Sequence, residues 1–263
     1  MPLSLLSHRN LIVELTRRDI ESRYRASMLG LAWTFLQPLL MLTVFTLVFA
    51  EIFKARWPGV EAGGRLDVAV VIFTGMIIHS FVAECLTRAP TLVTGNPNYV
   101  KKVIFPLEVL PFVALGSAAL QALVCFLILV AFILFSAATL TWTALLLPLV
   151  LLPLALLCLG LMWLLAAAGA YLRDVDQAMS FIVTLLLFLS PILYPLSALP
   201  EGLQAVVAAN PLTFFIEEAR SVLLWGRAPS WAGLAVATGA AALFALWARR
   251  WFERAKGGFA DVI

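Results

Sequence analysis

The chain has 263 residues, of which 63% are hydrophobic and only 13% are charged, and its mean hydropathy is +1.01. Soluble domains carry about 25% charged residues, so this composition excludes an ordinary soluble enzyme and indicates an integral membrane protein. The net charge of +3 accompanies no basic–aromatic module, and we therefore expect no nucleic-acid partner.

Six long apolar stretches make up most of the chain, and the charges fall almost entirely between them. Each stretch is close to or longer than the ~20 residues that a helix needs to cross a bilayer. Because backbone groups must be satisfied internally in lipid, and because the runs lack the alternation of barrel strands, we predict an all-α membrane protein. The predicted spans are residues 31–53, 68–86, 109–135, 143–169, 178–196 and 230–248.

The spans and their connections use nearly the whole length, so the sequence predicts one transmembrane domain over residues 1–263 and no separate soluble domain. No Gly-x-x-x-x-Gly-Lys-Ser/Thr phosphate loop is present, so any ATP would be bound by another chain. Cys85, Cys125 and Cys158 lie far apart, and no pair has the spacing of metal ligands. We expect no catalytic residue, cofactor or metal on this chain.

Lysine and arginine are distributed unequally between the two sides of the membrane. Five precede the first span, three lie between the second and third spans, one lies between the fourth and fifth, and four follow the sixth; the opposite side holds five. With an even number of spans both termini share a side, and the positive-inside rule places them in the cytoplasm.

Residues 1–30 precede the first span, and most of this segment has the pattern of an amphipathic helix. We predict that it lies in the cytoplasmic interface with Arg18, Arg23 and Arg25 near lipid headgroups. A solvated helix that contacts a partner is the alternative. Gly30 permits the bend into the first span.

Aromatic residues follow in the first span. Trp33 lies just inside it, as an aromatic-belt residue does, and Phe45, Phe49 and Phe53 repeat at i, i+4 spacing. Such a stripe in most cases faces lipid or packs internally. If these rings instead line a channel, their faces suit the apolar faces of sugar rings.

The connection 87–108 is predicted to be cytoplasmic and to hold a short helix that begins at Pro97, with Asn96 available as its cap. Its exposed apolar and basic residues suit docking onto a cytoplasmic partner; the alternative is a tethering turn with snorkelling lysines. The predicted coupling residues are Asn98, Tyr99, Val100, Lys101 and Lys102.

The segment 197–229 is too apolar for a simple loop and too interrupted to cross the membrane. We predict two short helices joined at Asn210-Pro211, the second of which is amphipathic, with Thr213, Glu217 and Arg220 on its polar face. We predict a re-entrant outer segment that acts as a gate, with an external amphipathic lid as the alternative. The predicted gate residues are Tyr194, Asn210, Pro211, Phe214, Phe215 and Glu217.

No predicted span has a Lys, Arg, Asp or Glu near its centre, which argues against an ion-coupled secondary carrier, and no repeat relates the two halves. A membrane enzyme that acts on lipid-linked sugar remains an alternative of another class. It would need a polar cluster at a membrane face, for which Glu108, Arg173 and Asp174 are the cytoplasmic candidates.

Several ordered motifs resemble the ABC-2-type permeases that export polysaccharides, most closely the O-antigen branch, with capsule and teichoic-acid exporters as near relatives. The resemblance covers essentially the whole chain. The motifs are Arg18–Trp33 followed by Gln37-Pro38-Leu39, Asn98-Tyr-Val-Lys-Lys102, Phe105-Pro106-Leu-Glu-Val-Leu-Pro111, Arg173-Asp174, Ser190-Pro-Ile-Leu-Tyr194, Asn210-Pro-Leu212 and Phe259–Ile263.

This resemblance implies a subunit of a bacterial inner-membrane exporter that assembles from two copies of this chain and two ATP-binding subunits, which would bind ATP and Mg²⁺. It also implies that a lipid-linked polysaccharide passes through a channel at the dimer midline. The ATP cycle would be sensed through Asn98 to Lys102 and the N-terminal helix, and the cargo lipid would enter near Arg23 to Gly30. An ABC-2 permease for a drug or a lipid is the alternative within the same fold.

Overall fold

The computed structural model describes residues 8–24, 28–52, 57, 65–100, 105–135 and 140–259. Every regular element in these ranges is helical, which confirms the predicted all-α class. The longer helices are α2 (Arg9–Tyr24), α3 (Trp33–Phe45), α4 (Arg65–Arg88), α7 (Leu110–Phe135), α8 (Leu147–Tyr171), α9 (Asp174–Phe188), α10 (Glu201–Ala209), α11 (Pro211–Leu223) and α12 (Trp231–Ala255). The shorter elements are α5 (Thr91–Thr94), α6 (Pro97–Val100), the 3-10 turns Gly30–Ala32, Leu107–Val109, Trp142–Leu146, Leu196–Ala198 and Lys256–Gly258, and the π-helical turn Thr46–Ile52.

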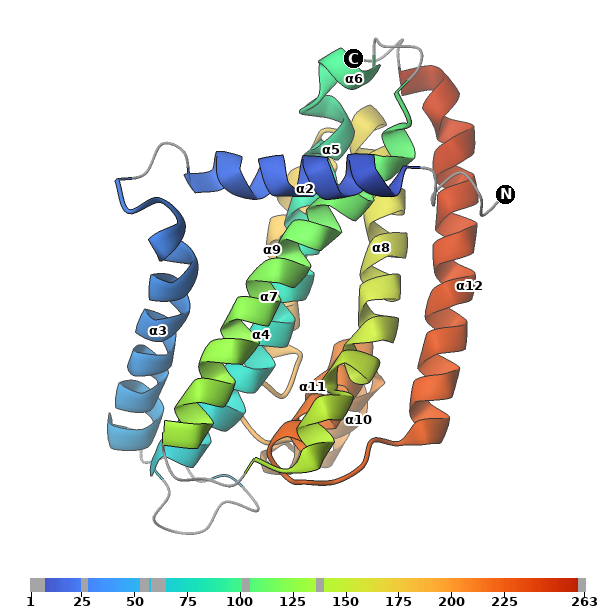
Figure 1. Ribbon diagram of the computed structural model, residues 1–263. Helices are drawn as coiled ribbons and strands as arrows, with labels where there is room; N and C mark the ends of the chain where they lie inside the picture. The colour runs from blue at the N-terminus through green and yellow to red at the C-terminus, as the bar shows by residue number, and fades with distance from the viewer. Residues whose placement is uncertain are drawn as a thin grey trace.

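Helices α3, α4, α7, α8 and α12 lie roughly along one common axis, and α2 lies across one end of them (Figure 1). Helices α5 and α6 and the last turns of α12 lie at this same end, which we call the α2 end. Helices α10 and α11 lie in the other half of the molecule, toward what we call the α10 end.

Four helical segments are long and apolar enough to cross a membrane: Val68–Arg88, Leu107–Phe135, Trp142–Tyr171 and Trp231–Gly258. They coincide with the second, third, fourth and sixth of the predicted spans. Each is 21 to 30 residues long, which is sufficient for a bilayer core of about 30 Å.

The first and fifth predicted stretches have a different structure from the other four. The first divides into α3 and the π-helical turn Thr46–Ile52, and its apolar helical part, Trp33–Phe49, is shorter than the four long segments. The helix predicted within 178–196 begins earlier and ends at Phe188. It stops close to Pro191, which cannot donate a backbone hydrogen bond and clashes with a preceding helical turn.

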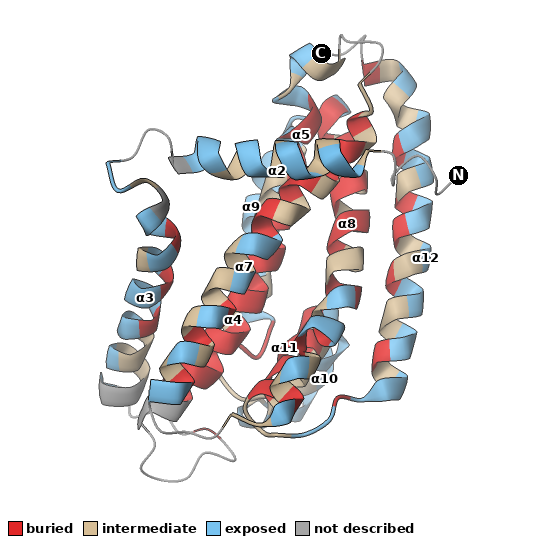
Figure 2. Ribbon diagram, viewed as in Figure 1, coloured by how far each residue is buried: buried red, intermediate tan, exposed pale blue. Residues whose placement is uncertain are grey.

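Helix α4 forms the centre of the bundle (Figure 2). In its most apolar 18-residue stretch 78% of the residues are buried, against 22% for both α7 and α12. Helices α7, α8, α9 and α11 all contact α4, and α12 packs along α8. The close approach of α12 to α8 requires a glycine at Gly160, because an added Cβ would lie 2.7 Å from the Phe244 ring.

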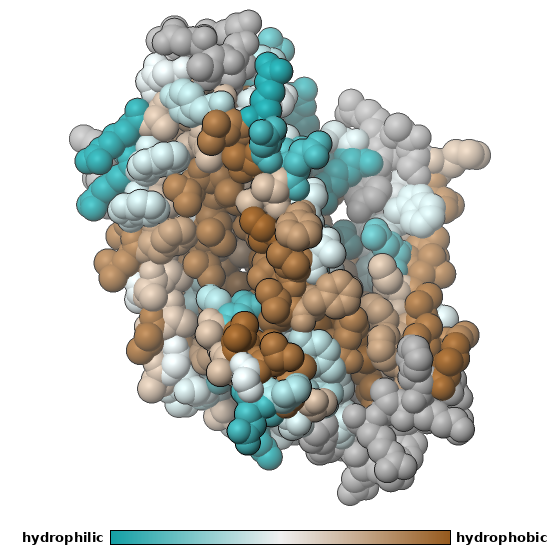
Figure 3. Space-filling model, turned by 180° about the vertical axis from the view of Figure 1, so that it is seen from behind, coloured by the Kyte–Doolittle hydropathy of each residue, from teal (hydrophilic) through white to brown (hydrophobic). Residues whose placement is uncertain are grey.

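The outer surface carries large apolar side chains, such as Leu127 of α7 and Leu243 of α12, which are 60% and 70% exposed. Figure 3 shows that hydrophobic residues dominate the middle of one face and that hydrophilic residues gather toward its two ends. A soluble monomer rarely exposes so large an apolar surface, whereas contact with lipid tails accounts for it.

Candidate functional site

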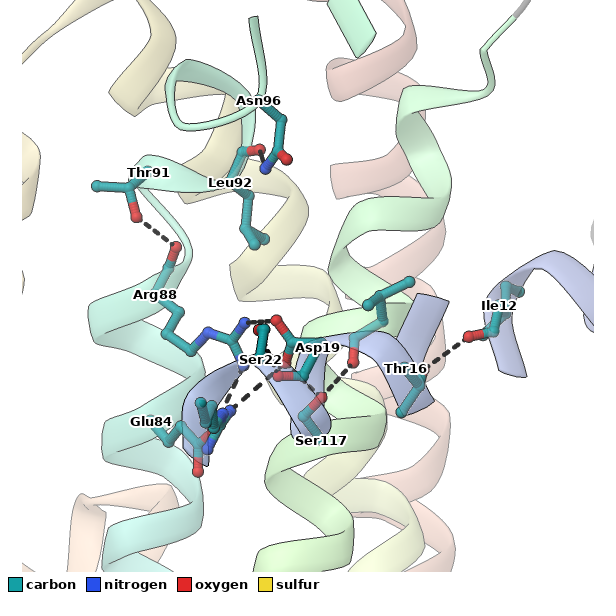
Figure 4. A network of polar contacts seen from close by, with 12 residues as sticks. Ile12, Thr16, Asp19, Ser22, Glu84, Arg88, Thr91, Leu92, Asn96 and Ser117 are labelled. Atoms are coloured by element: carbon teal, nitrogen blue, oxygen red, sulfur yellow. Dashed lines mark hydrogen bonds and ion pairs between the residues drawn. The ribbon is translucent and has the colours of Figure 1, made fainter. Parts of the chain in front are cut away.

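A network of charged residues joins α2 to the bundle at the α2 end (Figure 4). Asp19 of α2 accepts hydrogen bonds from Arg88 Nη2 at 2.7 Å and from Ser117 Oγ at 2.6 Å. Arg23 of α2 forms an ion pair with Glu84 of α4 and lies 3.7 Å from Asp19. These contacts fix the last turns of α2 across α4 and α7.

The charges of this network balance, since two arginines face two carboxylates. Burial opposes ionisation of Asp19, but hydrogen bonds from Arg88 and Ser117 and the charges of Arg88 and Arg23 outweigh it, so the pKa of Asp19 is held below its ordinary value. Asp19 therefore remains an anion at neutral pH and retains its partners.

The predicted lipid-contact residues take different positions. Arg18 is exposed and helps line a cavity of about 310 Å³ between α2, α6 and α7, whereas Arg23 belongs to the network. Arg25 lies outside the described residues. Gly30 has φ +49°, a left-handed conformation that favours glycine, at the turn that leads into α3.

The predicted coupling residues lie on and after α6. Asn98 is exposed, Val100 is partly buried, and the Tyr99 ring stacks on Phe105 with centroids 4.2 Å apart. Lys101 and Lys102 lie outside the described residues. The stacked pair attaches α6 to the segment that leads into α7.

Helix α5 is held closely against the end of α8. A Cβ added at Gly169 would lie 2.3 Å from the carbonyl oxygen of Pro90, the residue that precedes α5. Since backbone cannot yield as a side chain can, this position admits only glycine without a shift of α5. Beside the contact is a cavity of about 380 Å³, which Thr91, Thr94 and Arg173 help line.

The end of α12 is also tied to its neighbours at the α2 end. Lys256 pairs with Glu108 at 2.9 Å, and Tyr171 donates a hydrogen bond to the carbonyl oxygen of Ala255 at 2.8 Å. Among the described residues no ion pair or hydrogen bond joins Glu108 to Arg173 or Asp174, and the ion-pair partner of Glu108 is Lys256.

Two of the aromatic residues of the first predicted span, Phe45 and Phe49, pack inside the protein. Trp33 is 38% exposed, but Phe45 and Phe49, with ring centroids 6.1 Å apart, both pack against the buried cluster around Trp57 and Ile72. Phe53 lies outside the described residues. Phe45 also lines a cavity between α3, α4 and α7.

Asn210 organises the predicted gate region. Its Oδ1 accepts from the backbone N–H of Leu212 and caps α11, which begins at Pro211, while its Nδ2 donates to Ser190 Oγ; both distances are 3.0 Å. Tyr194 donates to the carbonyl oxygen of Phe188. These bonds connect α11 to the chain that follows α9.

The two phenylalanines of α11 face inward. Phe215 is buried in the core, and Phe214 lies partly buried against it with ring centroids 5.3 Å apart. Glu217 is half-exposed and forms an ion pair with Arg220 at 2.8 Å.

Arg220 is fully buried, although the amphipathic pattern placed it on an exposed polar face. Its guanidinium donates to the carbonyl oxygens of Val71, Pro191 and Ile192 at 3.2, 2.7 and 3.2 Å, and lies 4.7 Å from the centre of the Trp57 ring. Sequence reasoning missed this role, since a single polar position on an amphipathic helix gives no indication that backbone carbonyls surround it.

Within the described ranges, no three or more His, Cys, Asp or Glu residues are close enough to hold a metal ion. The structure is a helical bundle with two regions in which polar side chains join helices. One is the Asp19 network at the α2 end. The other, in the other half of the molecule, is the Arg220 cluster, which consists of Arg220, its ion-pair partner Glu217, the Trp57 ring and the backbone carbonyls that Arg220 bonds.

The sequence matches the ABC-2 type transporter family over residues 10–224. It is similar to the O-antigen export system permease protein RfbA of Myxococcus xanthus, with 26% identity over 262 residues that cover 98% of this chain and 97% of the relative. It is also similar to an O-antigen export system permease protein RfbA of Klebsiella pneumoniae, with 24% identity over 82% of this chain and 81% of the relative. Because the family match covers most of its length, the chain belongs to the ABC-2 type transporter family.

Proposed function

We propose that this chain is the membrane permease subunit of an ATP-driven exporter of O-antigen-type, lipid-linked polysaccharide in the inner membrane of a bacterium. The observation that carries the proposal is the end-to-end similarity to a permease named for O-antigen export, which spans 98% of this chain. The chain would perform no covalent chemistry itself.

The proposed topology has six crossings within a single domain over residues 1–263, with both termini in the cytoplasm. Helix α3 with its π-helical extension and helix α9 would supply the two crossings beyond the four long segments. The position of α2 and the last turns of α12 at one end supports a common side for the termini (Figure 1). Helices α10 and α11 would form the re-entrant outer segment between α9 and α12.

Two copies of the chain and two ATP-binding subunits would make up the exporter, with ATP and Mg²⁺ bound by those subunits. The partner would engage residues Asn98 to Lys102. The Gly169–Pro90 contact supports this role, since a rigidly seated α5 would transmit a push from α6 directly to α8.

The remaining residues are given roles within this framework. Arg18, Arg23, Arg25 and Gly30 would shape the membrane surface where the cargo lipid approaches. Trp33, Phe45, Phe49 and Phe53 would contact the glycan on its path after rearrangement of α3. The outer gate would consist of Tyr194, Asn210, Pro211, Phe214, Phe215 and Glu217, held in place by the Arg220 cluster.

Co-purification tests this assembly. The chain, extracted from its native membrane in mild detergent, should carry a stoichiometric ATP-binding subunit. The charge-reversed variant Lys101→Glu/Lys102→Glu should uncouple ATP hydrolysis from glycan export. A chain that purifies alone in several mild detergents, or export unchanged in the double variant, would contradict the proposed coupling.

A further inference from the structure

The cavity between α3, α4 and α7 has a volume of about 300 Å³ and reaches the last turn of α2. We call it the α3–α4 cavity. Its size is at the lower limit for small-molecule sites, which suits one chain of a lipid better than a bulky ligand.

Polar residues concentrate toward the α2 end of this cavity. They are Arg23 at the end of α2, Gln37 in the second turn of α3, Ser80 and Glu84 near the end of α4, and Gln121 of α7. Arg23 and Glu84 are the charged residues among its lining, and they form an ion pair with each other.

Apolar residues line the deeper part, farther from α2. Met41 and Phe45 follow Gln37 along α3, and Phe73, Met76 and Ile77 precede Ser80 along α4. At 1.5 Å per residue, the eleven positions from Glu84 back to Phe73 span roughly 16 Å along the bundle. The cavity thus changes from charged to apolar along the direction in which a membrane lipid lies.

The charged pair at the polar end also specifies a type of headgroup. Its two side chains offer one cation and one anion, and the network behind them is neutral, so a ligand with a net charge gains little. A zwitterion with a phosphate and a primary ammonium fits, since the phosphate can approach Arg23 while the ammonium donates to Glu84. A choline headgroup has no N–H to donate, and a glycerol headgroup has no cation.

We propose that the α3–α4 cavity binds one resident phospholipid with a phosphoethanolamine headgroup, with part of an acyl chain between α3 and α4. This site is additional to the proposed export function, since the lipid occupies the inside of one protomer and is not cargo. The bound acyl chain fills the space between α3 and α4 and so maintains the distance between these two helices.

Cys125 provides a probe of the site in the unmodified protein. It lines the cavity and is only partly buried, whereas Cys85 and Cys158 are fully buried. In lipid nanodiscs, Cys125 alkylation by a membrane-permeant maleimide should be at least about fivefold slower with phosphatidylethanolamine than with phosphatidylcholine or phosphatidylglycerol, since occupancy protects in proportion to 1 + [L]/Kd. Equal rates in the three lipids would overturn the proposal.

A pair of variants tests retention of the lipid by native mass spectrometry. Met76→Trp fills the apolar part of the cavity and should remove the retained phosphatidylethanolamine. Leu243→Trp makes a matched change on the exposed face of α12 and should retain it. If Met76→Trp does not fold, the Cys125 experiment alone decides. Folded Met76→Trp that retains as much phosphatidylethanolamine as wild type would contradict a resident-lipid site. The site would also be contradicted if added lipid-linked glycan displaced the phospholipid and protected Cys125 to the same degree.

Discussion

The Arg220 guanidinium of α11 donates a 2.7 Å hydrogen bond to the carbonyl oxygen of Pro191, in the chain segment that follows α9. The same side chain bonds to Val71 of α4 and is fully buried. One residue therefore joins three parts of the bundle that are far apart in sequence. An added Cβ at Gly75 of α4 would lie 3.0 Å from Arg220 Nη2, so α4 leaves just enough room for it.

We predict that Arg220→Met destabilises the protein by about 3 kcal/mol, since several buried carbonyls and the Glu217 carboxylate lose their donor. Arg220→Lys should recover only part of this loss, because an ammonium lacks the planar arrangement of donors. Thermal unfolding in detergent, followed by tryptophan fluorescence, measures both. Arg227→Met, at an exposed position in the loop before α12, is the control; an equal loss there would contradict the assigned role.

The attachment of α2 gives a second prediction. Asp19→Asn removes the anion that Arg88 and Ser117 bind and should cost about 2 kcal/mol, the usual value of hydrogen bonds to a charged group. Hydrogen exchange of the α2 amides should rise accordingly. Glu21→Gln on the exposed side of α2 breaks only its surface pair with Arg17 and should cost less than about 0.5 kcal/mol. If the α2 amides exchanged at similar rates in Asp19→Asn and Glu21→Gln, the Asp19 network would not be what holds α2 to the bundle.

The lowered pKa of Asp19 predicts how that anchor responds to pH. A carboxyl whose folded-state pKa is lowered contributes its full stability above the unfolded-state pKa of about 3.9, and loses it as pH falls through the lower folded-state value. The stability difference between wild type and Asp19→Asn should thus be constant from pH 7 to about 5 and decline only as the pH approaches and passes below 4. A decline centred near pH 6 would mean that the pKa is raised instead.

The close contact between Gly169 of α8 and Pro90, the residue before α5, gives a prediction about coupling to the proposed partner. Gly169→Ala places a methyl group against the Pro90 backbone and should displace α5. We expect this change to reduce any stimulation of ATP turnover by substrate in the proposed complex with ATP-binding subunits. Gly239→Ala on α12 meets no atom within 4 Å and should leave the stimulation unchanged, with slightly higher stability from the better helix former. The measurement is substrate-stimulated ATP turnover in the purified complex. Full stimulation in Gly169→Ala would exclude α5 from the coupling path.

The sequence predicts the helical class and the four longest apolar helices well, because a long uninterrupted apolar run is sufficient to indicate each of them. It also places the α10–α11 junction correctly, since Asn210 and Pro211 have strong local preferences as a helix cap and first residue. It places the α9 helix too late, because the apolar run continues past Phe188 while Pro191 ends the helix.

The polar contacts between distant helices could not be predicted in this way. Asp19, Glu84, Arg88 and Ser117 come from three helices, and nothing local to any of them specifies the others. Thr213 shows the same limit: it lies on the polar face of α11, yet it is buried and donates to the carbonyl oxygen of Val207 at 2.6 Å. Hydrophobic periodicity distinguishes polar from apolar faces, but not a solvated face from one that meets backbone carbonyls.

Glycan export is tested most directly by reconstituting the chain with the proposed ATP-binding subunit in proteoliposomes that contain lipid-linked O-antigen polysaccharide. The measurement is the amount of glycan that becomes accessible across the bilayer. Transfer should require both proteins and ATP hydrolysis, and it should stop when the ATP-binding subunit carries an inactivated phosphate loop. Transfer by this chain alone at the same rate, or ATP-driven transfer of a drug or phospholipid with none of the glycan, would contradict the proposed function.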